Sequence, residues 1–497
     1  MILISPKTNR AQKLAHFEKY VVLSIPFGLG MLAGYLSQKN KEVKIIDESV
    51  TPITNSMLNE YLRGMEPPYI FGISCLTANI NRAYELSKTL KERYPDSKVI
   101  LGGIHATVLP EECLNSGYVD IVVRREGEEA LNTLYELIKS RSDYSTVPGI
   151  SFIDADKNIV HNQDASLMTD LNSLPSFPYH FFKENLHRYN LGFIMASRGC
   201  PYDCIFCSQR SISGRLYRYM EPEKVIEQVD FLANKYKQRF IDFWDDNFVV
   251  NRKWTKRVCE LMRDNKFYEK TRFGCYTRGD ALSEEILSYL KEAGFTTIGF
   301  GMETASERLM KIINKGETVE ANIKGVKLAK KFGFRVGATF IMGLPTETRE
   351  ERLSSYRLAR ELNIDYARFN NACPYPGTKL YEIAKSENRL NVGANWENLN
   401  TVGAFVESSI LPYVPLSCKE DELRRDILKA NYSFWLRPKS IFLLLAGGNQ
   451  SGFVLPLKWY LKPAEWLSLA MFSTVILSRL AVTIIKTMGF ALKGDRN

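Results

Sequence analysis

Short apolar runs alternate with helical patterns over the first 143 residues of the chain. The runs lie at residues 1–5, 42–47, 69–75, 98–103 and 119–124, and apolar residues recur at helical spacing over 28–40, 79–94 and 127–140. Short β-branched runs between helices are typical of buried parallel strands. The pattern predicts an α/β fold for residues 1–143, a doubly wound, flavodoxin-like or Rossmann-like sheet with ligand sites at the carboxyl ends of its strands.

A second alternation fills residues 190–379. It follows segment 144–189, in which residues 148–160 predict a hairpin and the prolines of 171–182 a linker. The six apolar runs of the second alternation are 192–197, 240–246, 272–278, 296–304, 335–345 and 366–377, with helical patterns between them. Six strand–helix units predict a partial TIM-type (β/α)6 barrel, whose chemistry lies on the loops after the strands.

The remaining segment, 380–497, is less regular, and we expect it to be mainly helical. Its apolar stretches at 440–457 and 466–492 are both interrupted by polar residues, whereas a membrane-spanning helix needs about 20 consecutive apolar residues. Arg479, Lys486 and Lys493 recur every seven residues and so share one helix face. Such a helix either lies in a membrane interface or docks its apolar faces on the protein itself.

Composition and charge narrow the choice of partner only slightly. The chain has 66 basic and 56 acidic residues, a net charge of +10 spread over 497 residues. There is no concentrated basic patch with interleaved aromatic residues, so we do not expect a nucleic-acid partner. The first residues lack the features of a secretory signal, which predicts a cytoplasmic protein in a reducing compartment, with peripheral contact at the inner face of the membrane if the C-terminal helix is interfacial.

Three of the nine cysteines stand close together after the first barrel strand. Cys200, Cys204 and Cys207 have the spacing C-x3-C-x2-C. Structural zinc sites usually close four ligands, often as two C-x-x-C pairs, and the chain has no second pair. An iron–sulfur cube normally takes four thiolates, so three leave one iron open to a small molecule. The three cysteines are therefore candidate metal ligands and catalytic residues.

The run "CPYDCIFC" at 200–207 resembles the cluster motif of the radical S-adenosylmethionine (SAM) enzymes, including the aromatic Phe206. The resemblance covers the whole barrel. It implies a 4Fe-4S cluster on the three cysteines, with SAM chelating the fourth iron. Reduction of the cluster, for which we expect a ferredoxin or flavodoxin-type donor, cleaves SAM to methionine and a 5′-deoxyadenosyl radical.

The same resemblance assigns SAM contacts to residues at successive strand ends. Asp245, Asp246 and Asn247 stand where the family has an acidic turn for the methionine amino group, although the usual "GGE" lettering is absent. Glu303 matches the position that hydrogen-bonds the ribose hydroxyls, and Arg278 is a candidate partner of the SAM carboxylate. Gly343 lies in the stretch 340–345 that resembles the adenine-lining strand. Each of these residues alone could have a purely structural role. The assignment to SAM depends on their positions at the ends of successive strands.

The first domain resembles the cobalamin-binding subfamily of radical SAM enzymes. The likeness lies in residues 25–36, 101–112 and 125–130 and extends to 431–441, and it implies cobalamin between the first domain and the barrel mouth. The candidate contacts are Ser74, Gly102, Gly103, His105, Thr107 and Glu128. The D-x-H-x-x-G motif, whose histidine ligates cobalt, is absent, so we place His105 at the periphery of the cofactor. A nicotinamide cofactor is disfavoured, because the first strand is not followed by G-x-G-x-x-G.

These resemblances predict a methyltransferase that acts on an unactivated carbon. The alternatives are a non-methylating enzyme of the same subfamily, such as a ring-forming or oxidative one, and a non-catalytic cobalamin or iron–sulfur sensor. The apolar C-terminal region favours a hydrophobic small molecule or a lipid as substrate. Methylthiolation of tRNA is disfavoured, because the chain has no further clustered cysteines.

Overall fold

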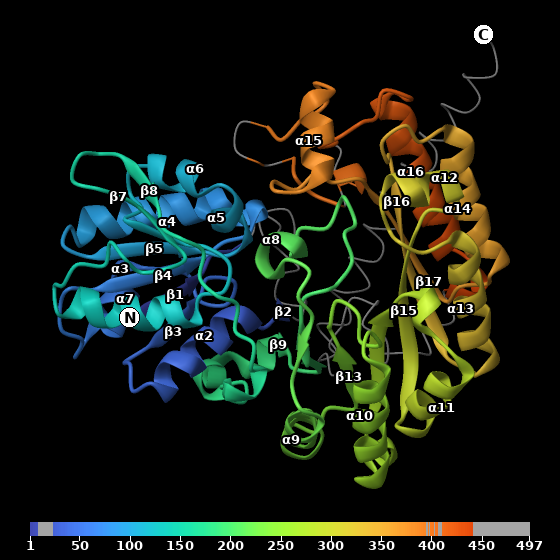
Figure 1. Ribbon diagram of the computed structural model, residues 1–497, viewed down its shortest axis with the longest axis horizontal. Helices are drawn as coiled ribbons and strands as arrows, with labels where there is room; N and C mark the ends of the chain where they lie inside the picture. The colour runs from blue at the N-terminus through green and yellow to red at the C-terminus, as the bar shows by residue number, and fades with distance from the viewer. Residues whose placement is uncertain (8–22, 394–395, 397, 402, 406–409, 441–497) are drawn as a thin grey trace, which may run out of the picture.

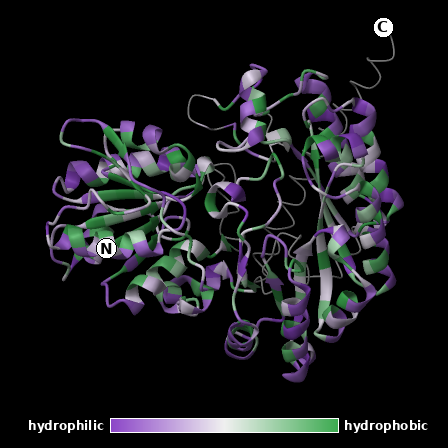
Figure 2. Cartoon of the chain, in the orientation of Figure 1, coloured by the Kyte–Doolittle hydropathy of each residue, from purple (hydrophilic) through white to green (hydrophobic). Residues whose placement is uncertain are grey.

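The computed structural model describes residues 1–7, 23–393, 396, 398–401, 403–405 and 410–440. Two bodies lie side by side (Figure 1), the first domain and the barrel, with the last described helices packed on the barrel. In Figure 2 the strands inside both bodies are predominantly hydrophobic, and the outer helices carry the hydrophilic residues.

The first domain has a seven-stranded sheet of order β3-β1-β4-β5-β6-β7-β8. The five predicted strands are confirmed as parallel neighbours: β3 (Lys44–Asp47), β1 (Ile2–Ser5), β4 (Ile70–Ser74), β5 (Lys98–Gly102) and β6 (Ile121–Val123). Side chains alternate between the faces, so Leu3 packs with α2 and α7, whereas Ile2 and Ile4 pack with α3, α4 and α6. The bounds of these helices are α2 (Phe27–Gln38), α3 (Asn55–Leu62), α4 (Ile80–Arg93), α6 (Pro110–Asn115) and α7 (Glu128–Lys139).

The predicted hairpin forms, with β7 (Ile150–Ile153) antiparallel to β8 (Ile159–His161). β7 also pairs antiparallel with β6, so the hairpin extends the first sheet. The first sheet thus runs on to His161, into the segment that the sequence assigned to a hairpin and linker.

The barrel prediction is also confirmed. Six parallel strands follow in chain order: β10 (Phe193–Ile194), β13 (Phe240–Phe243), β14 (Arg272–Thr277), β15 (Phe295–Glu303), β16 (Arg335–Met342) and β17 (Tyr366–Asn371). Within the described residues β10 and β17 do not pair, so the barrel stays open. Its outer helices are α9 (Pro222–Asp230), α10 (Arg252–Asp264), α11 (Glu284–Glu292), α12 (Glu307–Ile312), α13 (Val319–Lys331) and α14 (Arg349–Glu361).

Helices α15 (Lys379–Ser386) and α16 (Glu420–Trp435) follow the barrel. α16 lies along β17, where the Asn431 amide accepts from the Phe369 N–H at 3.2 Å and donates to the Phe369 carbonyl at 2.8 Å. The Trp435 indole donates to the Ala367 carbonyl at 2.8 Å. The C-terminal apolar stretches and their three cations fall in 441–497, outside the described residues; within the described residues no helix is long and apolar enough to cross a membrane.

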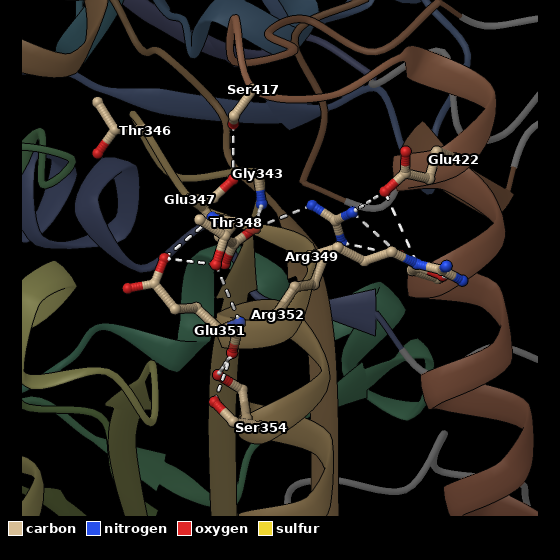
Figure 3. Close-up of polar contacts among 12 residues, drawn as sticks. Gly343, Thr346, Glu347, Thr348, Arg349, Glu351, Arg352, Ser354, Ser417 and Glu422 are labelled. Atoms are coloured by element: carbon tan, nitrogen blue, oxygen red, sulfur yellow. Dashed lines mark hydrogen bonds and ion pairs between the residues drawn. The ribbon is translucent and has the colours of Figure 1, made fainter.

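A buried charge cluster fastens α16 to the barrel (Figure 3). Arg352 of α14 is fully buried and donates to Asp426 at 3.0 Å and to Glu422 at 2.7 Å. Its other side faces Glu347 at 3.5 Å, whose carboxylate also accepts from the Gly343 N–H at 2.6 Å. Burial raises the pKa of Glu347, and the neighbouring Arg352 opposes that rise. Removing the central cation would leave buried carboxylates without compensation.

The first prediction concerns this cluster. We expect Arg352→Met to lower the free energy of unfolding by about 3–5 kcal/mol, the usual cost of breaking a buried ion pair. Arg357→Met is the matched control, because Arg357 lies on the same helix in an exposed pair with Glu350. It should leave the midpoint of unfolding unchanged. Equal midpoints for the two variants, measured by denaturant titration, would contradict the anchoring role.

Candidate active site

The three-cysteine loop follows β11 (Ser197–Arg198), which pairs antiparallel with β12 (Arg218–Tyr219), and leads into α8 (Gln209–Ser213). Gly199 opens the loop with φ +86°, and a Cβ there would lie 2.1 Å from the Leu216 carbonyl oxygen. The turn therefore requires glycine. Further along, Ile205 donates its N–H to the Ile313 carbonyl at 3.0 Å, which ties the loop to the barrel.

The three thiols lie near one another and near cations of the barrel. Burial raises the pKa of each thiol, that of Cys204 to about 11, whereas the charge of Lys315 opposes the rise at Cys204 and Cys207. In the described part of the chain no three ligand side chains converge on one point as they would around a single ion. A cube presents a different iron to each thiolate, so such convergence is not required. The donor set fits a cluster with three protein ligands better than a closed zinc site.

Arg278, which follows β14, braces this loop. Its guanidinium carbon lies 3.6 Å from the centroid of the Tyr202 ring. In the sequence Tyr202 stands between Cys200 and Cys204. Two of its nitrogens donate to Asp280, at 3.0 and 2.8 Å. The guanidinium is thus already paired, and the contact with the SAM carboxylate stays a prediction beside this structural role.

A cavity of about 460 Å³ opens beside the loop at the carboxyl ends of the barrel strands. Such a volume is typical of small-molecule sites. Four of the predicted SAM contacts line it together: Asp245, Asp246, Arg278 and Glu303. The other lining residues are Trp244, Tyr276, Thr277, Phe300, Gly301, Lys315 and Thr339. The expected convergence of strand ends is therefore present.

Asp245 presents an unsatisfied carboxylate oxygen at this cavity. Its Oδ1 accepts from the Ser197 hydroxyl, and Oδ2 has no hydrogen-bond partner among the described residues. The side chain is only 2% exposed, and burial raises its pKa to about 7. A buried acceptor left open at a cavity fits an amino group of a ligand, such as that of SAM. Asp246, the next residue, is exposed.

Glu303 closes β15 in a strained backbone conformation. Its φ is +57°, and the register with β16 shifts between Gly301 and Glu303. A non-glycine residue held in the left-handed region of φ/ψ space is more frequent at functional sites than elsewhere. The carboxylate is 6% exposed and accepts from the Lys315 ammonium at 2.8 Å. Glu303 lines the cavity with one oxygen bonded to Lys315, and its contact with the ribose stays a prediction.

Lys315 and Glu317 belong to this site, and the sequence analysis missed them. Both are buried and lie in the turn between α12 and α13, where no strand end marks them. Glu317 lies 3.8 Å from both Arg278 and Lys315, and within the described ranges its two oxygens make no hydrogen bond. The run "NKGET" at 314–318 places four charged or polar residues around one glycine, which is a sequence signal for a polar site.

Three predicted contacts are not among the residues that line the cavity. Asn247 is 1% exposed, and its side-chain oxygen accepts from the Thr277 hydroxyl at 3.0 Å. Gly343 has φ +84° and packs against Leu423 of α16, where a Cβ would lie 2.7 Å from that side chain. Phe206 packs against the core. The structure gives these residues supporting roles, and Thr339 lines the cavity from β16 instead of Gly343.

The first domain has its own pocket at the carboxyl ends of β1, β4, β5 and β6. Ser74, Gly102 and Gly103 line it beside the apolar Leu29, Leu32 and Leu131. Gly103 has φ +97°, and a Cβ would lie 2.4 Å from the Cys75 carbonyl oxygen, so the tight turn at the edge of this pocket requires glycine. The backbone and apolar walls at this edge fit one side of a large ring system with amide substituents, such as cobalamin, whereas the pocket itself, at about 60 Å³, is too small to enclose such a group.

The other predicted cobalamin contacts make internal hydrogen bonds. The His105 side chain is fully buried, and its nitrogens lie 3.2 Å from the Thr77 hydroxyl and 3.3 Å from Glu112. The Thr107 hydroxyl donates to the Gly103 carbonyl at 2.9 Å and accepts from the Arg125 N–H at 2.8 Å. Glu128 accepts from Arg198 of the barrel at 2.6 Å. These side chains support the pocket, and none of them lines it.

Two family models match the chain. The model described as the radical SAM superfamily matches residues 194–359, and the one described as the B12 binding domain matches residues 18–135. An uncharacterized methyltransferase of Pyrococcus horikoshii is 31% identical over 444 residues, 88% of this chain and 93% of that protein. The chain belongs to the radical SAM superfamily and carries a B12-binding domain.

Further relatives of this radical SAM protein have different named activities. The anaerobic magnesium-protoporphyrin IX monomethyl ester cyclase of Cereibacter sphaeroides is 31% identical, over 73% of this chain and 60% of its own. The hopanoid C-3 methylase of Methylococcus capsulatus is 25% identical, over 72% and 68%. The radical SAM methyltransferase TsrM of Kitasatospora setae, solved with cobalamin and a [4Fe-4S] cluster, shares the fold, with a TM-score of 0.69 at 17% identity over 88% of this chain and 89% of that one.

The comparisons confirm the family predicted from the sequence and its three cofactors. A radical SAM enzyme with a B12-binding domain uses a 4Fe-4S cluster, SAM and cobalamin. The described residues contain a three-cysteine loop beside a polar cavity of about 460 Å³ and a glycine-containing pocket at the edge of the first sheet. Which side chains touch each cofactor stays a prediction.

The raised pKa of Asp245 generates a test on the protein without cofactors. The ordinary pKa of an aspartate is near 3.8, and burial raises that of Asp245 in the folded protein to about 7. At pH values between these two, the folded state holds a proton that the unfolded state has lost. The contribution of Asp245 is therefore fully present at low pH, and stability falls by about 1.4 kcal/mol per pH unit as the pH rises through this window. We expect Asp245→Asn to be more stable than the natural protein at pH 8, with the difference vanishing near pH 4.

Thermal unfolding of the apoprotein across this pH range measures the difference. Asp264→Asn is the control, because Asp264 is exposed at the end of α10, outside the cavity; it should show a much smaller change. Parallel pH profiles for Asp245→Asn and the natural protein would show that Asp245 ionises normally.

Proposed function

We propose that this protein is a cobalamin-dependent radical SAM methyltransferase that methylates an unactivated carbon of a hydrophobic substrate. One observation carries the proposal: the three-thiol loop and its polar cavity lie at the carboxyl edge of the barrel, against the carboxyl edge of a B12-binding sheet. The relative from Pyrococcus horikoshii, named a methyltransferase, aligns across both domains.

The chain's own residues have distinct tasks in this proposal. Cys200, Cys204 and Cys207 hold the cluster. Asp245 accepts a hydrogen bond from the SAM amino group, and Glu303 accepts from the ribose hydroxyls. The loops at Ser74 and Gly102–Gly103 bind cobalamin through their backbone. With these groups bound, the cluster and SAM supply a 5′-deoxyadenosyl radical for hydrogen abstraction, and cobalamin supplies the methyl group.

A hydrophobic substrate is favoured by apolar side chains left in solvent near the site. Leu76, which follows β4 beside the cobalamin pocket, is 56% exposed. Leu216 and Tyr219, across from the three-cysteine loop, are 44% and 40% exposed. Exposed apolar groups of this kind mark binding surfaces when they gather in one region. The methylase of Methylococcus capsulatus is named for a hopanoid, which is hydrophobic.

The second candidate is a non-methylating radical enzyme, which the named cyclase of Cereibacter sphaeroides favours. Ring formation and methylation would use the same cofactor loops, so the residues described here do not separate them. The mass of the product does, since methylation adds one CH2 and ring formation removes hydrogen.

The decisive experiment starts from protein reconstituted anaerobically with iron, sulfide and cobalamin. Given SAM and a low-potential donor of the ferredoxin or flavodoxin type, we expect 5′-deoxyadenosine, S-adenosylhomocysteine and, with lipid extracts as substrate, products heavier by one CH2. Cys204→Ala should lose the cluster absorbance and 5′-deoxyadenosine but keep cobalamin. Cys418→Ala, in a cysteine outside the loop, should behave as the natural protein. Reconstituted protein that binds no cobalamin, or that gives only dehydrogenated products, would contradict the proposal.

A further inference from the structure

Four charged residues join the two cofactor-binding halves of the molecule in a single chain of ion pairs. Arg198 donates to Glu128 at 2.6 Å and to Glu126 at 3.2 Å, and Glu126 also accepts from Arg218 at 2.9 Å. The glutamates belong to the first domain and the arginines to β11 and β12 of the barrel. Every link therefore crosses from one domain to the other.

These residues, which we call the charge clamp, are withdrawn from water. The side chains of Arg218, Glu128 and Glu126 are 4%, 5% and 9% exposed, and that of Arg198 is 23% exposed. Burial opposes ionisation of Glu126, yet Arg218 and Arg198 hold its pKa below the usual value. Charges that are desolvated and ion-paired specify one geometry, because a displaced partner leaves a buried charge uncompensated.

The clamp borders both cofactor sites. On one side, Arg125 and Gly127 alternate with its glutamates along the chain, and both line the pocket of the first domain. On the other side, Arg198 lies two residues before Cys200, and its β11 neighbour Ser197 donates to Asp245 of the SAM cavity. A short rigid path thus connects the proposed cobalamin loop to the first cluster thiol and to the carboxylate proposed for SAM.

The linker is held by the same residues. Met168 donates its N–H to Glu126 at 2.9 Å, and its carbonyl accepts from Arg218 at 2.7 Å. Arg125 adds a bond from its Nε to the Ile212 carbonyl of α8, at 2.9 Å. Other contacts between the domains, such as Phe27 with Phe193 and Trp396 with Glu112, lie elsewhere, so the clamp is the part of the interface that stands between the two cofactor sites.

We propose that Glu126, Glu128, Arg198 and Arg218 are positioning residues that fix the cobalamin pocket relative to the cluster loop, and so set the geometry of group transfer between cofactors on different domains. The proposal rests on the proposed function for its consequences in catalysis. Domains of one chain move relative to each other unless their interface prevents it. Transfer requires reacting atoms about 3–3.5 Å apart, and an error of about 1 Å can cost about 100-fold in rate.

The clamp separates two measurable reactions. One electron delivered through the cluster would cleave SAM to methionine and a 5′-deoxyadenosyl radical, and the radical would become 5′-deoxyadenosine by taking a hydrogen atom from a thiol of the reducing buffer; this reaction needs only the barrel. Transfer of the SAM methyl group to cobalt(I) needs both domains; the sulfonium loses its methyl group to form S-adenosylhomocysteine, and cobalt provides both electrons of the new bond. The ratio of the two products reports interdomain geometry, and no organic substrate is required.

The experiment uses Glu126→Gln in the reconstituted holoenzyme, supplied with cob(I)alamin, SAM and, in a separate arm, a low-potential reductant. We expect the yield of S-adenosylhomocysteine to fall about tenfold or more, and 5′-deoxyadenosine formation to stay within about twofold. Glu48→Gln is the matched control, because Glu48 pairs with Arg82 wholly inside the first domain; both rates should stay unchanged. Equal losses of both reactions, or no loss of either, would overturn the proposal.

A second arm needs no cofactor. In scanning calorimetry of the apoprotein, we expect a single transition for the natural protein and for Glu48→Gln, and separate transitions of the two domains for Glu126→Gln. A double-mutant cycle uses Glu128→Gln, Arg198→Met and the variant with both changes. Their effects on the temperature difference between the two transitions should be non-additive, because the two residues pair with each other. If the natural protein transfers no methyl group, the proposed function is wrong, but the positioning role of the clamp is still tested by calorimetry. A single, unchanged transition for Glu126→Gln would refute that role.

Discussion

The carboxyl ends of two parallel sheets meet at one seam, and the rest of the molecule depends on this constraint. Parallel strands place all their following loops at one edge. The loop after β6 contacts β11 after β10, and Val108 after β5 lies close to Gly377 after β17. Loops that are remote in sequence, and chemically unrelated, are thereby brought to one place without any long excursion of the chain.

Several charged groups where the two sheets meet are left able to bind ligands, at a cost in the stability of the apoprotein. Asp245 and Glu317 are buried carboxylates whose oxygens remain incompletely hydrogen-bonded within the described residues, and Glu303 is held at a positive φ. Each of these features costs free energy in the apoprotein. In the buried cluster at Arg352, the central cation is bonded to Asp426 and Glu422, although one oxygen of Glu347 also lacks a partner among the described residues. That cluster holds α16 in place and does not line the cavity.

Sequence patterns predicted the strands well, because buried parallel strands are short apolar runs that few other elements imitate. The three-cysteine loop and the convergence of Asp245, Arg278 and Glu303 followed from the rule that strand ends meet. The rule fails where a residue at a strand end is taken up by other contacts, as Asn247 is by Thr277 and Gly343 by Leu423, because position along a strand end does not fix what a residue faces. Lys315 was missed because it reaches the cavity from a turn between helices. Glu128 was assigned to cobalamin because its partner Arg198 is 70 positions away in the chain.

An open barrel has two unpaired strand edges, and such an edge invites pairing with a second copy of the chain. Along β17, the groups of Ala367 and Phe369 that face away from β16 are occupied by the side chains of Trp435 and Asn431, and the Asn371 N–H by the Thr401 carbonyl. The Asn431 side chain thus makes the two hydrogen bonds to Phe369 that a residue of a further β-strand would make. The barrel can stay open toward its neighbouring domain while this border is protected from edge-to-edge aggregation.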